Sequence, residues 1–124
     1  MLCAQCKIPV KERPALDFLA HELRTLPSSI PVPKMKDWTV FRARTDGCAA
    51  CYQMGYKGRI GIFEIILVDD AIEALILRRP SELAVKKAAR EQEQITMHED
   101  GLLKIIAGTT DREELERVVG TFKK

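Results

Sequence analysis

The stretch GCAACYQMGYKGRIGIFE, residues 47 to 64, joins a Cys-x-x-Cys pair to three glycines and an apolar run. The chain opens with the same spacing in LCAQCK, residues 2 to 7, and its cysteines are Cys3, Cys6, Cys48 and Cys51. A Cys-x-x-Cys turn places two thiolates on one side of a tight turn, where both can reach one tetrahedral metal ion. Two such pairs with no cysteine left over predict a four-thiolate site for structural Zn²⁺.

Two other roles for these cysteines stay open at this point. A disulfide framework is typical of small secreted domains, but no signal peptide precedes Cys3 and no apolar run is long enough to span a bilayer. A redox Cys-x-x-Cys usually occurs singly near a βαβ pattern, whereas here two copies flank residues 7 to 47. We therefore expect a reduced, cytoplasmic protein in which the cysteines bind metal.

The charge balance bears on possible partners. The chain has 20 basic and 18 acidic residues, a formal net charge of +2. A dedicated nucleic-acid surface would show a strong basic bias, so no nucleic-acid partner is expected. The glycines at 55, 58 and 61 match neither G-x-x-x-x-G-K-[ST] nor G-x-G-x-x-G, and we interpret them as a turn after the second cysteine pair.

The first half of the chain predicts one helix and two strands. Pro14 can open a helix whose apolar face carries Leu16, Leu19, Leu23 and Leu26. Prolines then mark residues 27 to 37 as an extended linker. Alternating or β-rich composition predicts strands over residues 38 to 44 and 60 to 67.

The second half predicts four short helices, at residues 70 to 78, 82 to 92, 97 to 107 and 111 to 121. Their start signals are Ser81 and the capping-box pairs Asp70 with Glu73, Thr96 with Glu99, and Thr110 with Glu113. Gly108 suits the left-handed position after a helix. The apolar positions expected to pack a compact bundle are Ile72, Leu75, Ile76, Leu83, Leu103, Ile106, Leu115, Val118 and Val119.

The sequence thus predicts an α+β fold in two parts. Residues 1 to 68 would form a small zinc-anchored subdomain with a few strands and one helix. Residues 69 to 124 would form a helical bundle of about four short helices.

At this level the chain resembles a known family. LCAQCK, GCAACYQMGYKGRIGIFEI, LVDDAIEALIL and MHEDGLLKIIAGTTDREELERVV look like the C-terminal region of the ring-forming ATPases that drive type II secretion and type IV pilus assembly. The motifs stand in the family's order and cover nearly the whole chain. The resemblance implies that Cys3, Cys6, Cys48 and Cys51 are the metal ligands.

The resemblance also implies that the catalytic core, with its ATP and Mg²⁺ sites, lies upstream and is absent from this chain, which would be a non-catalytic accessory region. Expected partners are that ATPase core, neighbouring subunits of a hexameric ring, and secretion or pilus platform proteins at the inner membrane, reached from the cytoplasm. Arg59 and Glu64 would contribute to packing against the core.

A last set of residues resembles the alanine-isoleucine and leucine-isoleucine pairs of the related retraction motors. Ala71, Ile72, Leu75 and Ile76 would form a subunit contact in the ring or simply pack inside the domain. The alternative function is a zinc-ribbon-like module that binds nucleic acid. It would require a basic face formed by Arg42, Arg44, Lys57 and Arg59.

Overall fold

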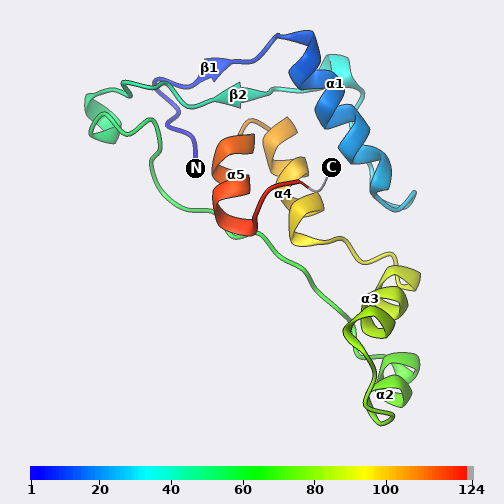
Figure 1. Cartoon of the computed structure of the whole chain (residues 1–124). Coiled ribbons are helices and arrows are strands. Elements are labelled where there is room, and N and C mark those ends of the chain that lie inside the picture. The colour runs from blue at the N-terminus through cyan, green and yellow to red at the C-terminus, as the bar shows by residue number, and fades with distance from the viewer. Residues whose placement is uncertain (123–124) are drawn as a thin grey trace.

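A computed structural model describes residues 1–122, in which a very small sheet lies along one edge, beside the helices (Figure 1). Strands β1 (Ile8–Pro9) and β2 (Phe41–Arg42) pair antiparallel, with Ile8 opposite Arg42 and Pro9 opposite Phe41. The helices are α1 (Arg13–Glu22), α2 (Asp70–Ile76), α3 (Glu82–Glu91), α4 (Met97–Ile106) and α5 (Arg112–Val119), with 3₁₀ turns at Leu23–Thr25, Met35–Asp37 and Ala49–Cys51. The predicted α+β class is confirmed, and so are the five predicted helices.

The hydrophobic core lies between α1, α4 and α5. Its buried side chains come from distant parts of the chain: Leu19, Leu23, Val40, Leu102, Ile105, Ile106 and Leu115. Burying one such side chain is worth about 1.5–3 kcal/mol relative to leaving it exposed. The core draws on residues from both sides of the boundary expected at residue 68, and that boundary stays a prediction.

Helix α4 lies at the centre of this core, to which it contributes Leu102, Ile105 and Ile106. Its sequence also provides the residues that begin and end the helix. Thr96 and Glu99 form the predicted capping box at its start. Gly101 lets α5 approach closely, since a Cβ there would lie 2.3 Å from Cδ1 of Leu115. Gly108, with φ +72°, ends the helix as predicted and packs against the carbonyl of Thr39.

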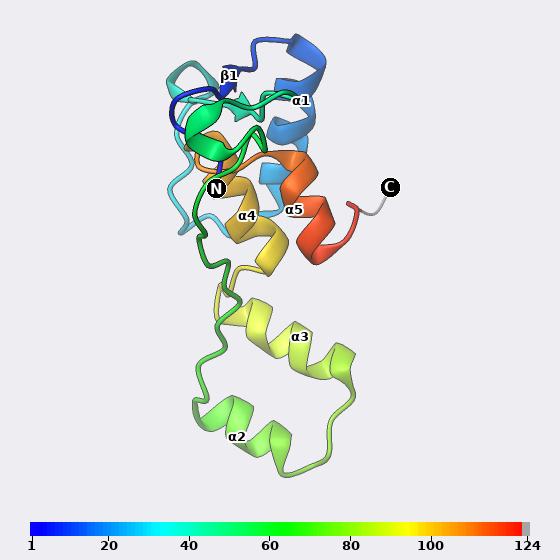
Figure 2. The same cartoon turned by 90° about the vertical axis from the view of Figure 1, so that its left-hand side faces the viewer.

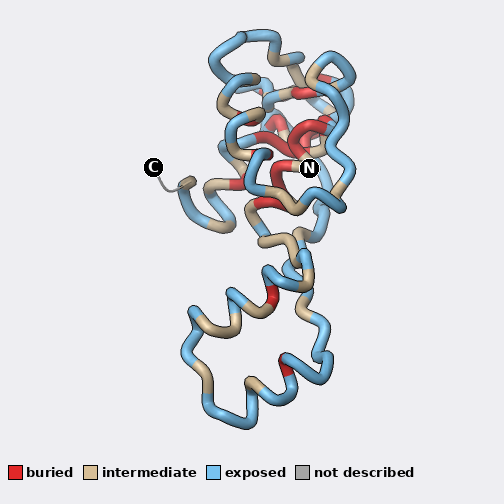
Figure 3. Tube along the Cα trace, turned by 90° about the vertical axis from the view of Figure 1, so that its right-hand side faces the viewer, coloured by how far each residue is buried: buried red, intermediate tan, exposed pale blue. Residues whose placement is uncertain are grey.

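Helices α1, α4 and α5, with the small sheet, form the body of the protein. Helices α2 and α3 form a hairpin that stands away from this body (Figure 2). They pack on one another, with Ile72 and Ala89 buried, whereas α4 packs on α5 and α1. Figure 3 shows these buried positions of the hairpin in red, apart from the buried residues of the body. The four C-terminal helices therefore form two separate pairs. Ile76, Leu83 and Val118, expected in a compact bundle, are exposed.

The caps of two helices differ by one residue from the prediction. Asp69, rather than Asp70, caps α2 by accepting from the N–H of Ile72. Asp111, rather than Thr110, caps α5 by accepting from the N–H of Glu114. In both places the extended residue directly before the first turn carries the carboxylate that can reach the free N–H groups.

The predicted strand over residues 60 to 67 is wrong. The segment runs stretched out between the cysteine region and α2 (Figure 1), and the two-stranded sheet of the described residues contains β1 and β2. The N–H of Phe63 donates to a side chain, Oδ2 of Asp100, at 2.9 Å. A strand needs a neighbouring backbone as its hydrogen-bond partner, and none lies alongside in residues 1–122. For the same reason the strand predicted over residues 38 to 44 shortens to Phe41–Arg42.

Candidate metal centre

Two turns bring the four cysteines together from opposite ends of the first half of the chain. The Sγ atoms of Cys3, Cys6, Cys48 and Cys51 all lie within 4.8 Å of one another. The separations are 3.8 Å for Cys3 and Cys48, 3.9 Å for Cys6 and Cys51, and 3.8 Å for Cys48 and Cys51. These are far longer than a disulfide bond of about 2.05 Å.

The cluster has the dimensions of a tetrahedral metal site. Ligand sulfurs about 2.3 Å from a tetrahedral ion lie about 3.8 Å apart, which matches the observed separations. Cys3, Cys6 and Cys51 are buried, and they pack against Cys48. Four inward-facing thiols at this spacing can hold one metal ion with no open coordination position.

Backbone donors prepare Cys51 to act as a thiolate. The N–H groups of Cys48 and Gly55 lie 3.1 and 3.2 Å from its Sγ. Burial raises the pKa of Cys51, but these donors and the neighbouring thiols outweigh it and lower the pKa to about 6. Burial, followed by thiol contacts, raises the pKa of Cys6 to about 12. A bound cation would supply the charge that lets all four sulfurs ionise together.

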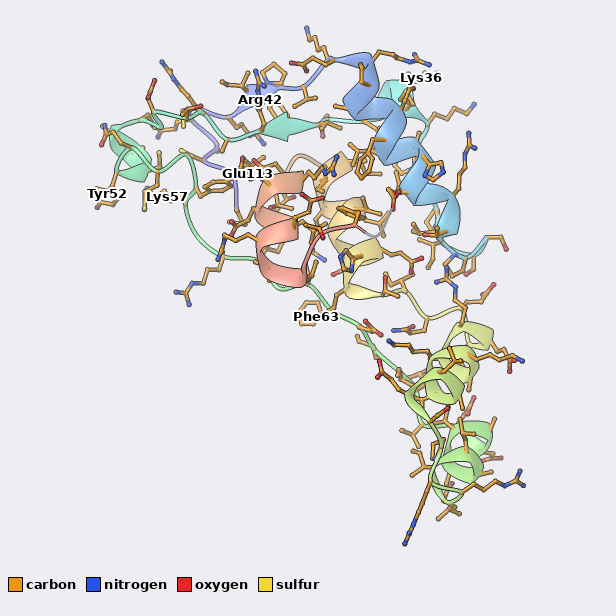
Figure 4. All side chains as sticks on the ribbon, viewed as in Figure 1. Lys36, Arg42, Tyr52, Lys57, Phe63 and Glu113 are labelled. Carbon is orange, nitrogen blue, oxygen red and sulfur yellow. The ribbon has the colours of Figure 1, made fainter. Side chains whose placement is uncertain are left out.

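The second turn depends on two left-handed residues that sequence reasoning missed. Tyr52 and Gln53 have φ of +53° and +60°, a region that non-glycine residues seldom occupy. The N–H of Gln53 donates to the carbonyl of Cys48 at 2.9 Å, and the N–H of Met54 donates to the carbonyl of Cys51 at 3.1 Å. These bonds hold the turn, and the side chain of Tyr52 lies at its outer end near Lys57 (Figure 4).

A buried carboxylate fastens the cysteine region to the C-terminal helices. Asp111 accepts from the hydroxyl of Tyr56 at 2.9 Å and from the N–H of Ala43 at 2.9 Å while it caps α5. Sequence reasoning missed this junction, although its signals were a tyrosine just after the cysteines and an aspartate directly before a helix.

Two further bonds cross the same junction. The N–H of Leu2 donates to the carbonyl of Thr109 at 2.9 Å, and Nζ of Lys7 donates to the carbonyl of Gly108 at 2.8 Å. The first cysteine turn is thereby attached to the loop between α4 and α5. The cysteine cluster and the helical core therefore share one contact region.

The other predicted site residues lie apart from the cysteine cluster, on the stretched segment and on α2. Arg59 and Glu64 are both exposed on the stretched segment, and Oε2 of Glu64 accepts from the N–H of Met97 at 3.2 Å. No ion pair joins Arg59 to Glu64 in residues 1–122. On α2, Ile72 is buried and Leu75 is half-buried, whereas Ala71 and Ile76 are exposed. That helix thus has one face in the hairpin and one face in solvent.

In the part of the chain that is described, no helix combines the length and apolar character needed to cross a membrane.

Comparison with known proteins identifies the family. Residues 1–117 match the family described as "Type II/IV secretion system protein". The "Type II secretion system protein E" of Pseudomonas aeruginosa is 36% identical over 118 residues, 95% of this chain and 21% of that protein. The "Type II secretion system ATPase E" of Vibrio cholerae is 37% identical over 117 residues, 94% of this chain and 21% of that protein.

A pilus protein is similar as well. The "Type IV pilus assembly ATPase PilB" of Thermus thermophilus is 33% identical over 114 residues, which make up 92% of this chain and 12% of that protein. The chain thus spans about a fifth or less of the length of these relatives. With its tetracysteine cluster and its match over residues 1–117, the chain belongs to the type II/IV secretion system protein family.

Proposed function

We propose that this chain is a non-catalytic, zinc-anchored region of a larger ATPase that powers protein secretion or pilus extension. Two relatives that match more than nine tenths of the chain carry the word ATPase in their names. The chain accounts for 21% and 12% of their lengths, which leaves room for a nucleotide-hydrolysing core elsewhere in the protein. A closed shell of four thiolates favours Zn²⁺ in a structural role.

The observation that carries this proposal is the junction at Asp111. Three hydrogen bonds at Asp111 join Tyr56, after the second cysteine pair, Ala43, directly after strand β2, and the first turn of helix α5. A zinc-anchored arm and a helical core held together in this way can move as one body. Our proposal is that this body passes movements of the ATPase core to other subunits of a hexameric ring and to platform proteins at the inner membrane, from the cytoplasmic side.

The stretched segment supports a contact with that core. Between Ile60 and Val68 five large apolar side chains are exposed: Ile60, Phe63, Ile65, Leu67 and Val68. A run of this kind marks an interaction surface, and most of its backbone groups have no partner within residues 1–122 and can pair with another strand. We propose that the ATPase core covers it, with Arg59 and Glu64 at the edge of the contact.

Helix α2 is proposed to meet a neighbouring subunit. Its exposed face presents Ala71 and Ile76, and Leu77 follows at the end of the helix with 80% of its surface exposed. Ile72 and Leu75 face the partner helix within the hairpin and support this surface from behind.

The nucleic-acid alternative gains no comparable support. Arg42, one of the four cations it requires, lies 3.9 Å from a carboxylate oxygen of Glu12. Glu12 itself has a lowered pKa, chiefly because backbone N–H groups donate to its carboxylate, so it carries its charge at neutral pH. The basic face is therefore interrupted.

Two measurements test the proposal together. Isothermal titration of the 124-residue chain with magnesium-ATP should show no submicromolar binding, because a phosphate-binding loop is missing from its sequence. In the full-length protein, Cys48→Ser should abolish secretion or pilus extension while nucleotide binding persists. Tight ATP binding by the chain, or normal transport by the full-length variant with its metal lost, would refute it.

A further inference from the structure

An arginine, Arg90, joins the projecting hairpin to the body. Arg90 lies in the last turn of α3, and its Nη1 and Nη2 donate to Oε2 and Oε1 of Glu99 at 2.9 Å each. Nη1 also donates to the carbonyl of Gln94 at 3.0 Å, and Nη2 contacts the carbonyl of Thr25. A two-pronged arginine–carboxylate pair is the strongest and most directional form of this contact.

The acceptor is fixed firmly on the body. Glu99 is 5% exposed in α4. Its oxygens also accept from the N–H of Thr96 at 2.9 Å and from the hydroxyl of Thr25 at 2.9 Å. Because the carboxylate is held from two sides before Arg90 arrives, the arginine meets a charge of fixed position.

The segment after Arg90, residues 92 to 94, has fewer of its buried polar atoms hydrogen-bonded than Glu99 has. Glu93 has a left-handed φ of +59°. Oε1 of Gln92 and Nε2 of Gln94 are buried and have no hydrogen-bond partner within residues 1–122. Left-handed backbone at a non-glycine residue and unpaired buried amides both cost free energy. The Arg90 contacts offset this cost at the end of α3.

Two short segments of chain connect the hairpin to the body. Its helices bury Ile72 and Ala89 against one another. It leaves the body through residues 67 to 69 and 92 to 95, and Nε2 of Gln92 donates to the carbonyl of Leu67 at 2.9 Å, which ties these connections together. The views in Figures 1 and 2 show both connections at the same end of the hairpin.

We propose that residues 67 to 69 and 92 to 95 form a hinge, and that the Arg90–Glu99 pair is the latch that sets the direction of the α2–α3 hairpin. With the latch closed, α3 keeps one orientation relative to α4. With the latch open, the hairpin turns as a rigid unit and its own helices persist. This inference rests on contacts within the chain and is independent of the metal and of the proposed ATPase.

Residual dipolar couplings of backbone amides in the 124-residue chain test the latch. In the wild type, one alignment tensor should fit α2, α3, α4 and α5. In Arg90→Ala, the α2 and α3 couplings should shrink together and require a separate tensor, while their helical chemical shifts are retained. Glu99→Gln keeps one of the two acceptor oxygens, so it should produce a smaller loss of shared alignment.

Arg78→Ala is the matched control. It removes an exposed arginine that follows α2, outside the two hinge segments, and should leave the single tensor unchanged. If Arg90→Ala also keeps one tensor, the latch is wrong. If Arg90→Ala or Glu99→Gln melts α3 itself, Arg90 is needed for folding of the hairpin rather than for its direction, and the proposal is overturned too.

Discussion

The hydroxyl of Tyr56 lies 3.0 Å from Oδ1 and 2.9 Å from Oδ2 of Asp111 and donates to this buried carboxylate. The tyrosine follows the second cysteine pair, and the aspartate caps the last helix. Burial, then the negative charge of Asp111, raises the pKa of Tyr56. The donor proton therefore stays in place through the ordinary range of pH.

Tyr56→Phe should lower the free energy of unfolding by about 1.5–3 kcal/mol, because a bond to a buried charge is lost while the ring still fills its space. Urea unfolding at pH 7 measures this. Tyr52→Phe is the control, since Tyr52 is 80% exposed, and it should have almost no effect. Equal stability of the two variants would mean that the Asp111 junction does not hold the metal region to α5.

Cys48→Ser should eliminate metal binding and reproduce the melting curve of chelated wild type. A hydroxyl ionises too weakly to replace a thiolate, and structural zinc supplies about 10–16 kcal/mol in small peptide systems. Elemental mass spectrometry should find one zinc per wild-type chain prepared in reducing, zinc-supplemented buffer. Wild type without metal, or a variant that melts like metal-loaded wild type, would refute the four-thiolate site.

Chelation should loosen residues 1 to 60 and also the loop from Gly108 to Asp111, while α2 and α3 keep their protection. The loop is included because Leu2 and Lys7 donate to its carbonyls. The hairpin is excluded because it packs on itself. Amide exchange with and without chelator measures the effect. Equal losses in the hairpin and in residues 1 to 60 would contradict the expectation.

The stabilising contribution of Glu99 should be lost in acid. Burial raises the pKa of Glu99, but hydrogen bonds from Arg90, Thr96 and Thr25 outweigh it and hold the pKa below the ordinary 4.5. A lowered folded-state pKa adds stability that is complete above about pH 4.5 and is lost as the pH falls through the folded value. The gap in unfolding free energy between wild type and Glu99→Gln should therefore narrow from pH 6 to pH 3. Parallel pH curves from urea unfolding would contradict this assignment.

The sequence by itself determined the parts of this protein that depend on near neighbours. Each cysteine pair spans four residues, and the capping box of α4 joins Thr96 to Glu99. Caps and turns use atoms within one turn of the chain, so their residue types predict them directly. For the same reason the helix boundaries could be predicted to within a few residues.

Tertiary structure alone decided which surfaces meet. Tyr56 and Asp111 are 55 positions apart, and Arg90 and Thr25 are 65 apart, so no local pattern pairs them. The run at residues 60 to 67 has a strand's composition, but whether it pairs depends on a neighbour that residues 1–122 do not provide. Leu83 and Leu102 are the same residue type, yet one is 76% exposed and the other 1%, because burial depends on what packs against a helix face rather than on the face itself.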